Sequence, residues 1–189
     1  MVRFQYGWIR MKEHTEKYQA LPQNFFDQDV KIVARELLGC RLCMKSPLGT
    51  VKKQVISETE AYDGESDLAC HASKGQTKRT VVMYGESGHC YVYLCYGIHW
   101  LLNVVTGPKG YPAAVLIRGS EDHLGPGILT KALGVDGSFN GTLLSPKNRL
   151  WIEPREGDEP EVSSGPRVGV DYAGDYWSKV PYRFWFSKR

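Results

Sequence analysis

Long apolar runs and an even set of cysteines are both missing from this chain of 189 residues. No apolar run approaches the roughly 18 residues that a membrane-spanning helix needs. The first 25 residues have a charged start but no apolar core of signal-peptide length, and the five cysteines are odd in number. We therefore expect a soluble protein without membrane contact, in a reducing, intracellular setting.

Signatures of metal and nucleotide binding are equally sparse. Cys40-x-x-Cys43 is a close cysteine pair, but zinc fingers need a second close pair, and candidates such as His71 are scattered. The zinc deaminase signature of His-x-Glu with Pro-Cys-x-x-Cys is absent. Gly125-Pro126-Gly127 is too short for a phosphate-binding loop and lacks its lysine spacing. We expect no metal ion and no cofactor.

Positive charge and aromatic side chains are the abundant features. The net charge of +3 permits a nucleic-acid partner without requiring one, and eleven tyrosines with five tryptophans exceed what a small core needs. The most basic stretch, residues 63–79, carries Lys74, Lys78 and Arg79 and has no acid after Asp67. Such a loop suits contact with the phosphates of a DNA backbone.

Hydrophobic periodicity predicts one α+β domain. Asp27 or Asp29 caps a helix that ends before Gly39, and Pro47 with Gly49 turns the first hairpin. The strands expected are 41–45, 51–62, 90–95, 99–106, 113–118 and 180–186, with a second helix at 125–134. We expect a curved, mainly antiparallel sheet surrounded by several helices, with residues 1–23 as an N-terminal arm and residues 24–189 as the single domain.

Two acids inside the strand at 51–62 contradict the local pattern, because acids are depleted from strands and rarely buried without a partner. Alternation places Ile56, Glu58, Glu60 and Tyr62 on one face, with the Cα atoms of the two acids about 6.6 Å apart. The pair suits the acid and base of an inverting hydrolase, with water between the carboxyl groups. The alternative is that one or both acids simply pair with Arg118 or with a backbone group.

An aromatic run fills one strand and the turn after it. Tyr91 and Tyr93 share a face, which is more typical of a packed sheet than of a platform for bases. Tyr96 stands beside Gly97 at the tip of a hairpin, where little core is available, and an exposed ring there can enter a base stack. Arg118, at the end of its strand, is the counter-ion of a glutamate, a phosphate ligand or a surface arginine.

Several groups of residues carry a resemblance to a known family, and they follow one another in the family's order. They are Glu58-Thr59-Glu60-Ala61-Tyr62 with His71, Tyr91-Val92-Tyr93-Leu94-Cys95-Tyr96-Gly97 with Asn103, Leu116-Ile117-Arg118, Gly125-Pro126 with Lys131-Ala132-Leu133-Gly134, and Arg167-Val168-Gly169-Val170. From about Asn24 to its C-terminus the chain resembles the alkyladenine, or 3-methyladenine, DNA glycosylase family. Members usually carry an apolar or small residue where this chain has Cys95.

The resemblance implies a monofunctional DNA glycosylase without cofactor or lyase activity. Such an enzyme flips alkylated or deaminated purines (3-methyladenine, 7-methylguanine, hypoxanthine, ethenoadenine) out of duplex DNA and inserts a β-hairpin in their place. It hydrolyses the N-glycosidic bond with a water activated by a glutamate, which starts base excision repair. It also implies a monomer that is associated with DNA, in the cytoplasm or nucleoid of a bacterium or in the nucleus of a eukaryote.

Roles follow position by position from the same resemblance. Glu60 matches the general base of the family, and Arg118 matches the residue that holds the attacking water. Tyr62, His71 and Tyr93 match the base pocket. Asn103 matches the residue that excludes normal guanine, and Tyr96 matches the one that fills the gap in the duplex. A purine alkylated at N3 or N7 is already cationic and needs little or no general acid to leave, so one base is sufficient. Glu58 is then expected to be supporting.

A catalytically silent nucleic-acid-binding domain of the same fold is the rival hypothesis. It would use the basic loop and the tyrosine surface without cutting the glycosidic bond. A pure binder has no need of a buried carboxylate facing a polyanion, so Glu60 beside Arg118 favours the enzyme. A zinc-stabilised interaction module is a third class, which would require bound metal.

Overall fold

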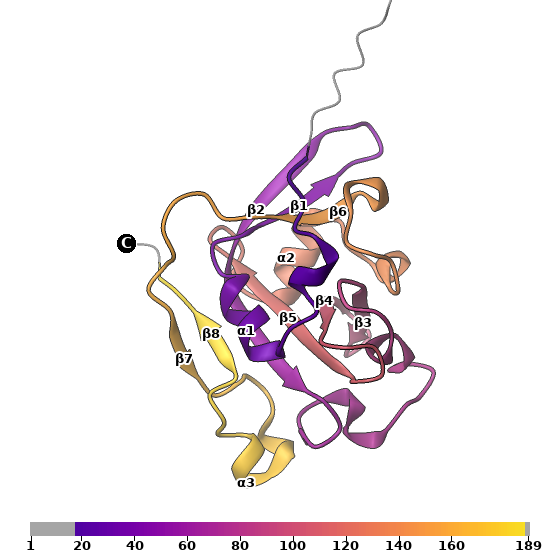
Figure 1. The fold of residues 1–189 in the computed structure, drawn as a ribbon, viewed down its shortest axis with the longest axis vertical. Helices are drawn as coiled ribbons and strands as arrows, with labels where there is room; N and C mark the ends of the chain where they lie inside the picture. Colours follow the sequence, from indigo (N-terminus) through magenta and orange to yellow (C-terminus); the bar gives the residue numbers. More distant parts are fainter. Residues whose placement is uncertain (1–17, 188–189) are drawn as a thin grey trace, which may run out of the picture.

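Eight antiparallel strands and three short α-helices make up the part of the chain that the computed structural model describes, residues 18–187 (Figure 1). The strands are β1 (Arg41–Lys45), β2 (Val51–Asp63), β3 (Cys90–Cys95), β4 (His99–Thr106), β5 (Ala113–Ser120), β6 (Leu150–Glu153), β7 (Ser163–Gly165) and β8 (Arg183–Trp185). The helices are α1 (Val30–Glu36), α2 (Pro126–Leu133) and α3 (Gly174–Trp177). Short 3-10 turns lie at Gln23–Phe25, His71–Lys74, Val81–Tyr84, Gly137–Phe139, Pro146–Asn148 and Asp171–Ala173.

The sheet is open, in the order β3-β4-β5-β2-β1-β6, and β8 pairs with both β2 and β7 beside this path. This arrangement confirms the predicted α+β class. The long strand β2 organises it, because its first half pairs with β1 while its second half lies between β5 and β8. The segment that holds Glu58 and Glu60 therefore has a neighbouring strand on each side.

Helix α1 covers one face of this sheet (Figure 1). Asp29 caps it by accepting a hydrogen bond from the backbone nitrogen of Lys31 at 2.9 Å. The helix ends at Glu36, earlier than the position before Gly39 that periodicity predicted, and Gly39 adopts the expected left-handed conformation with φ 81°. A buried hydrogen bond of 2.7 Å from the hydroxyl of Thr59 to the carbonyl of Ala34 fixes the helix on β2.

An irregularity in β2 corrects the predicted alternation of its side chains. The pairing with β5 shifts register between Ile56 and Thr59, which is the mark of a β-bulge. Ile56 consequently packs in the main core with Ala61, so placing Ile56 on the face of Glu60 was wrong. Glu58 and Glu60 do share a face, since both approach the guanidinium of Arg118.

The two faces of the sheet carry different cores. The main core, between the sheet and helices α1 and α2, is mostly aliphatic and includes Leu102, Val115 and Ile117. The opposite face holds a smaller cluster in which Tyr91 is buried, with the rings of Tyr62 and Tyr93 packed against it. The aromatic run therefore faces away from the main core.

The second half of the described region differs from the predicted strands in two ways: two strands were not predicted, and one was predicted too long. Strands β6 and β7 are short and have no alternating pattern, and the predicted strand at 180–186 contains only the three residues of β8. Leu21 donates a backbone hydrogen bond of 2.7 Å to the carbonyl of Ile152 in β6. Residues 1–17 of the predicted arm lie outside the described residues. None of the helices within 18–187 has the length and apolar character needed to cross a lipid bilayer.

Candidate active site

Glu60 is a fully buried carboxylate at the centre of the second face of the sheet. Its Oε1 accepts a hydrogen bond of 2.8 Å from the backbone nitrogen of Val168, and its Oε2 accepts one of 2.9 Å from the hydroxyl of Tyr62. The Nε of Arg118 lies 3.6 Å from Oε1. Its closest donors are thus neutral, with one guanidinium slightly farther away.

Burial dominates the acid–base behaviour of this group. Loss of hydration raises the pKa of Glu60 above its usual value of 4.5, and the charge of Arg118 and the hydrogen bonds from Val168 and Tyr62 offset only part of that rise. A carboxylate with a raised pKa is a stronger proton acceptor once it is ionised. This environment suits a general base.

Glu58 is held differently, although it has the same chemistry. Its Oε1 accepts hydrogen bonds from the Nε of Arg118 at 2.9 Å and from the Nε of Arg183 at 2.6 Å. The carboxylate is therefore committed to two guanidinium groups. The two acids are not an equivalent pair. The alternative interpretation, that one or both acids pair with Arg118 or with a backbone group, holds for both, since Glu58 pairs with Arg118 and Glu60 accepts from the backbone nitrogen of Val168.

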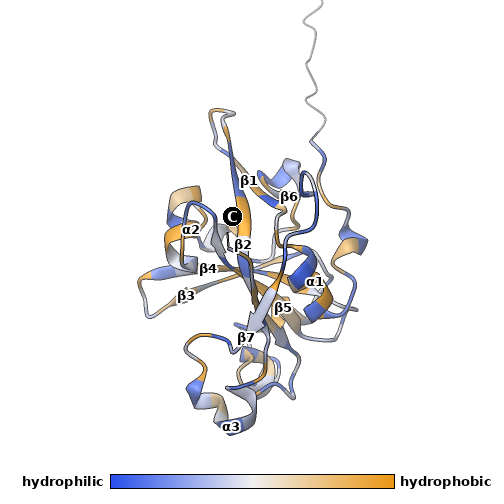
Figure 2. Cartoon of the chain, turned by 90° about the vertical axis from the view of Figure 1, so that its left-hand side faces the viewer, coloured by the Kyte–Doolittle hydropathy of each residue, from blue (hydrophilic) through white to orange (hydrophobic). Residues whose placement is uncertain are grey.

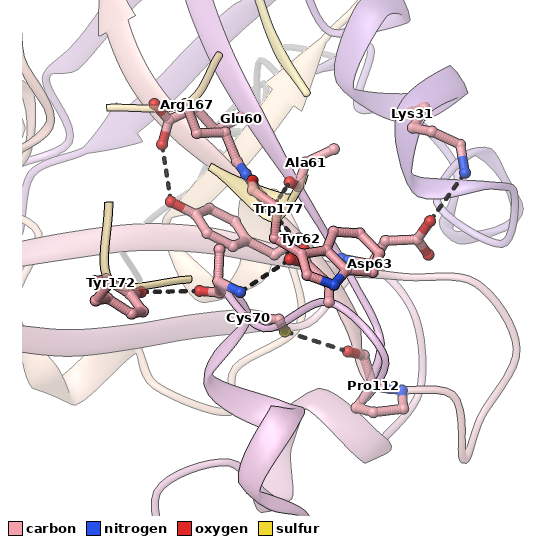
Figure 3. A network of polar contacts seen from close by, with 12 residues as sticks. Lys31, Glu60, Ala61, Tyr62, Asp63, Cys70, Pro112, Arg167, Tyr172 and Trp177 are labelled. Atoms are coloured by element: carbon pink, nitrogen blue, oxygen red, sulfur yellow. Dashed lines mark hydrogen bonds and ion pairs between the residues drawn. The ribbon is translucent and has the colours of Figure 1, made fainter. Parts of the chain in front are cut away.

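A buried ion pair fixes the segment that supplies the backbone donor to Glu60. Arg167 and Asp67 are both completely buried, and their side chains form two parallel hydrogen bonds, one of which joins Nη2 to Oδ1 at 2.8 Å. The same guanidinium donates to the carbonyl of Ala61 at 2.9 Å and lies 4.9 Å from the ring centroid of Tyr62. Figure 3 shows this network around Tyr62, with the tyrosine hydroxyl directed at Glu60. Arg167 thus ties the loop of Val168 to the strand of Glu60.

A recess opens beside this network. Counted with the open solvent at its mouth it encloses about 330 Å³. The structure brings all four predicted pocket residues into its lining, namely Tyr62, His71, Tyr93 and Asn103. The remaining lining residues are Ala69, Cys70, Met83, Tyr91, Ala114 and Tyr172.

Aromatic rings form one wall of the recess. The ring centroids of His71 and Tyr93 lie 4.7 Å apart at an angle of 72° between planes, and Tyr91 lies 5.4 Å from Tyr93. The Nδ1 of His71 is 2.9 Å from the hydroxyl of Tyr91. Burial, with smaller contributions from Arg79 and then Lys74, lowers the pKa of His71 to about 4. The imidazole is therefore neutral at pH 7, so the wall is uncharged.

Asn103 forms part of the rigid floor. Its side-chain nitrogen donates a hydrogen bond of 3.0 Å to the carbonyl of Tyr91, and the residue is 3% exposed. A side chain held in this way cannot swing aside, so its atoms set the shape of the recess.

Comparison with known proteins places these features in a family. The family model described as methylpurine-DNA glycosylase matches residues 24–124 and 122–189, which is most of the chain. The chain belongs to this family. Three relatives of the glycosylase carry the name "Putative 3-methyladenine DNA glycosylase". The relative from Methanocella arvoryzae is 42% identical over 188 residues, covering 87% of this chain and 91% of the relative.

The other two relatives match over similar lengths. The Myxococcus xanthus protein is 47% identical over 176 residues, covering 87% of this chain and 89% of the relative. The Legionella pneumophila protein (strain Corby) is 41% identical over 174 residues, covering 88% of this chain and 94% of the relative. The resemblance found from the sequence motifs is thereby confirmed at the level of the family.

Tyr172 is a pocket residue of this glycosylase that sequence reasoning missed. The residue is 70% exposed, and its hydroxyl donates a hydrogen bond of 3.0 Å to the carbonyl of Ala69. It thereby links the loop that follows Arg167 to the segment that carries His71. No periodic pattern marks either loop, so no signal in the sequence pointed to Tyr172. Tyr91, by contrast, shares a strand face with Tyr93, and alternation could have predicted it as a pocket residue.

The tip of the β3–β4 hairpin projects from the body of the glycosylase (Figure 2). Tyr96 is 92% exposed there and adopts a left-handed conformation with φ 50°, next to Gly97 with φ 71°. Leu94 and Ile98 are also exposed, so the tip is apolar. A left-handed tyrosine is strained by about 1–3 kcal/mol, and such strain clusters at functional sites.

The three predicted DNA-backbone cations, Lys74, Lys78 and Arg79, are all exposed. The guanidinium carbon of Arg79 lies 4.8 Å from the ring centroid of Tyr93, so this cation also borders the aromatic wall. The five cysteines are free thiols, and among residues 18–187 no three His, Cys, Asp or Glu side chains come together as ligands of a metal ion.

Proposed function

We propose that this DNA glycosylase flips an alkylated or deaminated purine into the recess and hydrolyses its N-glycosidic bond, with Glu60 as general base and Arg118 holding the attacking water. The observation that carries the proposal is the buried carboxylate of Glu60, which stands beside a guanidinium at the side of an aromatic recess. The substrate class is 3-methyladenine, 7-methylguanine, hypoxanthine and ethenoadenine.

Stacking in the recess supplies the energy for extrusion of the base. Flipping a nucleotide costs about a few kcal/mol, and a damaged or mismatched base costs least. Stacking on an aromatic ring returns about 1–3 kcal/mol per base. Tyr62, His71 and Tyr93 surround the recess, so their rings together offset the cost of extrusion. Asn103, held rigid on its floor, is the residue proposed to obstruct normal guanine.

The chemical step needs one proton acceptor. The oxygen of water attacks C1′ of the sugar while Glu60 takes a proton from the water, and the electron pair of the C1′–N bond leaves with the purine. A purine alkylated at N3 or N7 starts with a positive charge and leaves neutral, so it requires no general acid, whereas hypoxanthine and ethenoadenine are neutral at the start and take up a proton from solvent as they leave. The charge of Glu60 also stabilises the positive charge that develops on the sugar. The product is an abasic site in an uncut strand, as expected of a monofunctional enzyme.

Removal of the ring at the hairpin tip is expected to weaken binding to DNA that holds a lesion. Tyr96→Ala deletes the side chain that fills the gap left by the flipped nucleotide, so we expect a loss of about 1–3 kcal/mol in binding free energy, or about fivefold to 150-fold in affinity. Fluorescence anisotropy with a duplex carrying ethenoadenine measures it. Leu48→Ala, at the 94% exposed tip of the β1–β2 turn, is the matched control. Equal losses in both variants would contradict the role of Tyr96.

Salt is expected to weaken binding steeply. The logarithm of the binding constant should fall with the logarithm of salt concentration by a slope of about −0.9 per neutralised phosphate. Replacing Lys74 and Lys78 together by glutamine should make the slope shallower by about two. Lys53→Gln is the control, because the ammonium of Lys53 already pairs with Glu153 at 2.9 Å. If the slope of the double variant equals that of the parent protein, these two lysines do not contact the DNA backbone.

A panel of duplexes tests the proposed function against the rival of a silent binding domain. Each duplex carries one of the four lesions, the protein is in excess, and released purine is separated by chromatography. We expect release from at least the cationic 3-methyladenine and 7-methylguanine, with strands that stay intact until alkali is added. Binding to all four duplexes without release of any base would favour the silent domain.

A further inference from the structure

Arg183, on the last strand of the described region, contacts the acidic residues of the site through Glu58. On β8 it lies directly opposite Glu60 in the pairing with β2, yet its Nε reaches diagonally to Glu58 at 2.6 Å. Its guanidinium carbon lies 4.7 Å from the ring centroid of Trp185, the next residue on the same face of β8. An arginine that packs on a ring and donates to a carboxylate has little freedom to move.

Glu58 joins this arginine to Arg118. A single oxygen of Glu58, Oε1, accepts from Arg183 on β8 and from Arg118 on β5, so the carboxylate bridges the two strands that flank β2. The side chains of Glu58 and Arg118 are mostly buried, at 15% and 18% exposure. The pair of arginines compensates the charge of Glu58 and leaves one positive charge beside Glu60.

The distances show which carboxylate receives the hydrogen bond of Arg118. Its Nε lies 2.9 Å from Glu58 but 3.6 Å from Oε1 of Glu60, which is beyond the range of a normal hydrogen bond. Glu58 therefore competes with Glu60 for the guanidinium. Without Glu58, the nearest carboxylate partner of Arg118 would be Glu60 itself.

We propose that Glu58 and Arg183 are a positioning pair that holds Arg118 just short of Glu60, so that Arg118 orients the attacking water and does not form a direct ion pair with the base. This inference rests on the proposed function. It assigns a role to Glu58, which sequence alternation placed on the face of Glu60, and to Arg183, which the sequence analysis did not single out.

The pair has a consequence for the pH dependence of excision. Besides Glu58 and Tyr62 on its own strand, Glu60 faces Arg118 on β5, Tyr93 on β3 and Arg167 beyond Tyr62. If Glu58 is replaced by glutamine, Arg118 turns to Glu60 and stabilises its ionised form. The pKa of Glu60 then falls, and the acidic fall-off of the rate moves to lower pH, while the rate at the plateau also drops because the water has lost its holder.

Single-turnover excision of 7-methylguanine from a duplex, with protein at saturating concentration, tests the proposal. We expect Glu58→Gln and Arg183→Gln each to lower the plateau rate by about tenfold to a hundredfold with little change in affinity for DNA. Arg183→Lys should recover part of the loss. The double variant should be no slower than Glu58→Gln, because the two residues act as one unit. Arg41→Gln, which removes a mostly buried arginine from its pair with Glu153, is the matched control with an unchanged rate.

Several outcomes would overturn the proposal. One is a rate equal to that of the parent protein in Arg183→Gln. A second is a double variant whose loss of rate equals the product of the losses of the two single variants. A third is an acidic fall-off of the rate of Glu58→Gln at the same pH as that of the parent protein. Arg183→Gln keeps the test decisive if Glu58→Gln fails to fold, because the side chain of Arg183 is 30% exposed. Failure of the parent protein to release any base would instead contradict the proposed function, so the two failures are distinguishable.

Discussion

Replacing Glu60 by glutamine is expected to lower the single-turnover rate of purine release by about 100- to 10,000-fold, the contribution typical of a general base. The amide has nearly the shape of the carboxylate and keeps an oxygen that accepts from the backbone nitrogen of Val168. It cannot take a proton from water, and it carries no charge to face the positive charge that develops on the sugar. Affinity for the lesion duplex should stay the same or rise, because a negative charge facing a polyanion is removed.

The matched control for this substitution is Glu153→Gln. Glu153 is also a buried carboxylate, 3% exposed, but it pairs with Lys53 and Arg41 away from the recess. Its replacement should affect stability and leave the rate of excision unchanged. A Glu60→Gln variant that keeps more than about a tenth of the parent rate would be incompatible with general-base catalysis by this residue.

Replacing Asp67 by asparagine is expected to lower the free energy of unfolding by about 3–5 kcal/mol, the cost typical of removing one partner from a buried ion pair. Arg167 is then left as a completely buried cation without its counter-ion. Because Arg167 also holds the carbonyl of Ala61 and precedes Val168, the variant should lose excision activity as well. Urea denaturation followed by circular dichroism measures the loss of stability.

Lys179→Gln provides the comparison for Asp67. Lys179 pairs with Asp175 at 3.7 Å, but both side chains are largely exposed to solvent. Removing this ion pair should leave the urea midpoint unchanged, as is usual for surface salt bridges. If Asp67→Asn unfolds at the same urea concentration as Lys179→Gln, the buried pair does not support the loop of Val168.

The elements that the sequence predicted well are those set by local chemistry. The N-terminal cap at Asp29, the turn at Gly39 and the C-terminal cap of α2 at Gly134 all appear where Asp and Gly placed them. Alternation also put Glu58 and Glu60 on one face. It failed at Ile56 because a β-bulge inserts an extra residue without a signature in the side chains.

The candidate site was predictable in part, but from the resemblance to a family and not from local chemistry. Tyr62, His71, Tyr93 and Asn103 line one recess, as the resemblance to the family implied. The partners that hold the site came only from the fold. Asp67 with Arg167 and Glu58 with Arg183 are each separated by 100 residues or more, and no local pattern links such distant positions.

The most direct test of Glu60 as general base is the pH dependence of single-turnover excision of 7-methylguanine by the parent protein and by Glu60→Gln. The base is active when ionised, so the parent rate should fall as pH drops, with a midpoint above the usual carboxyl pKa of 4.5 because burial raises the pKa of Glu60. His71, with a pKa of about 4, titrates lower. We expect this fall-off to disappear from the small remaining rate of Glu60→Gln. The same fall-off in both proteins, or a parent rate that stays constant down to pH 4.5, would contradict it.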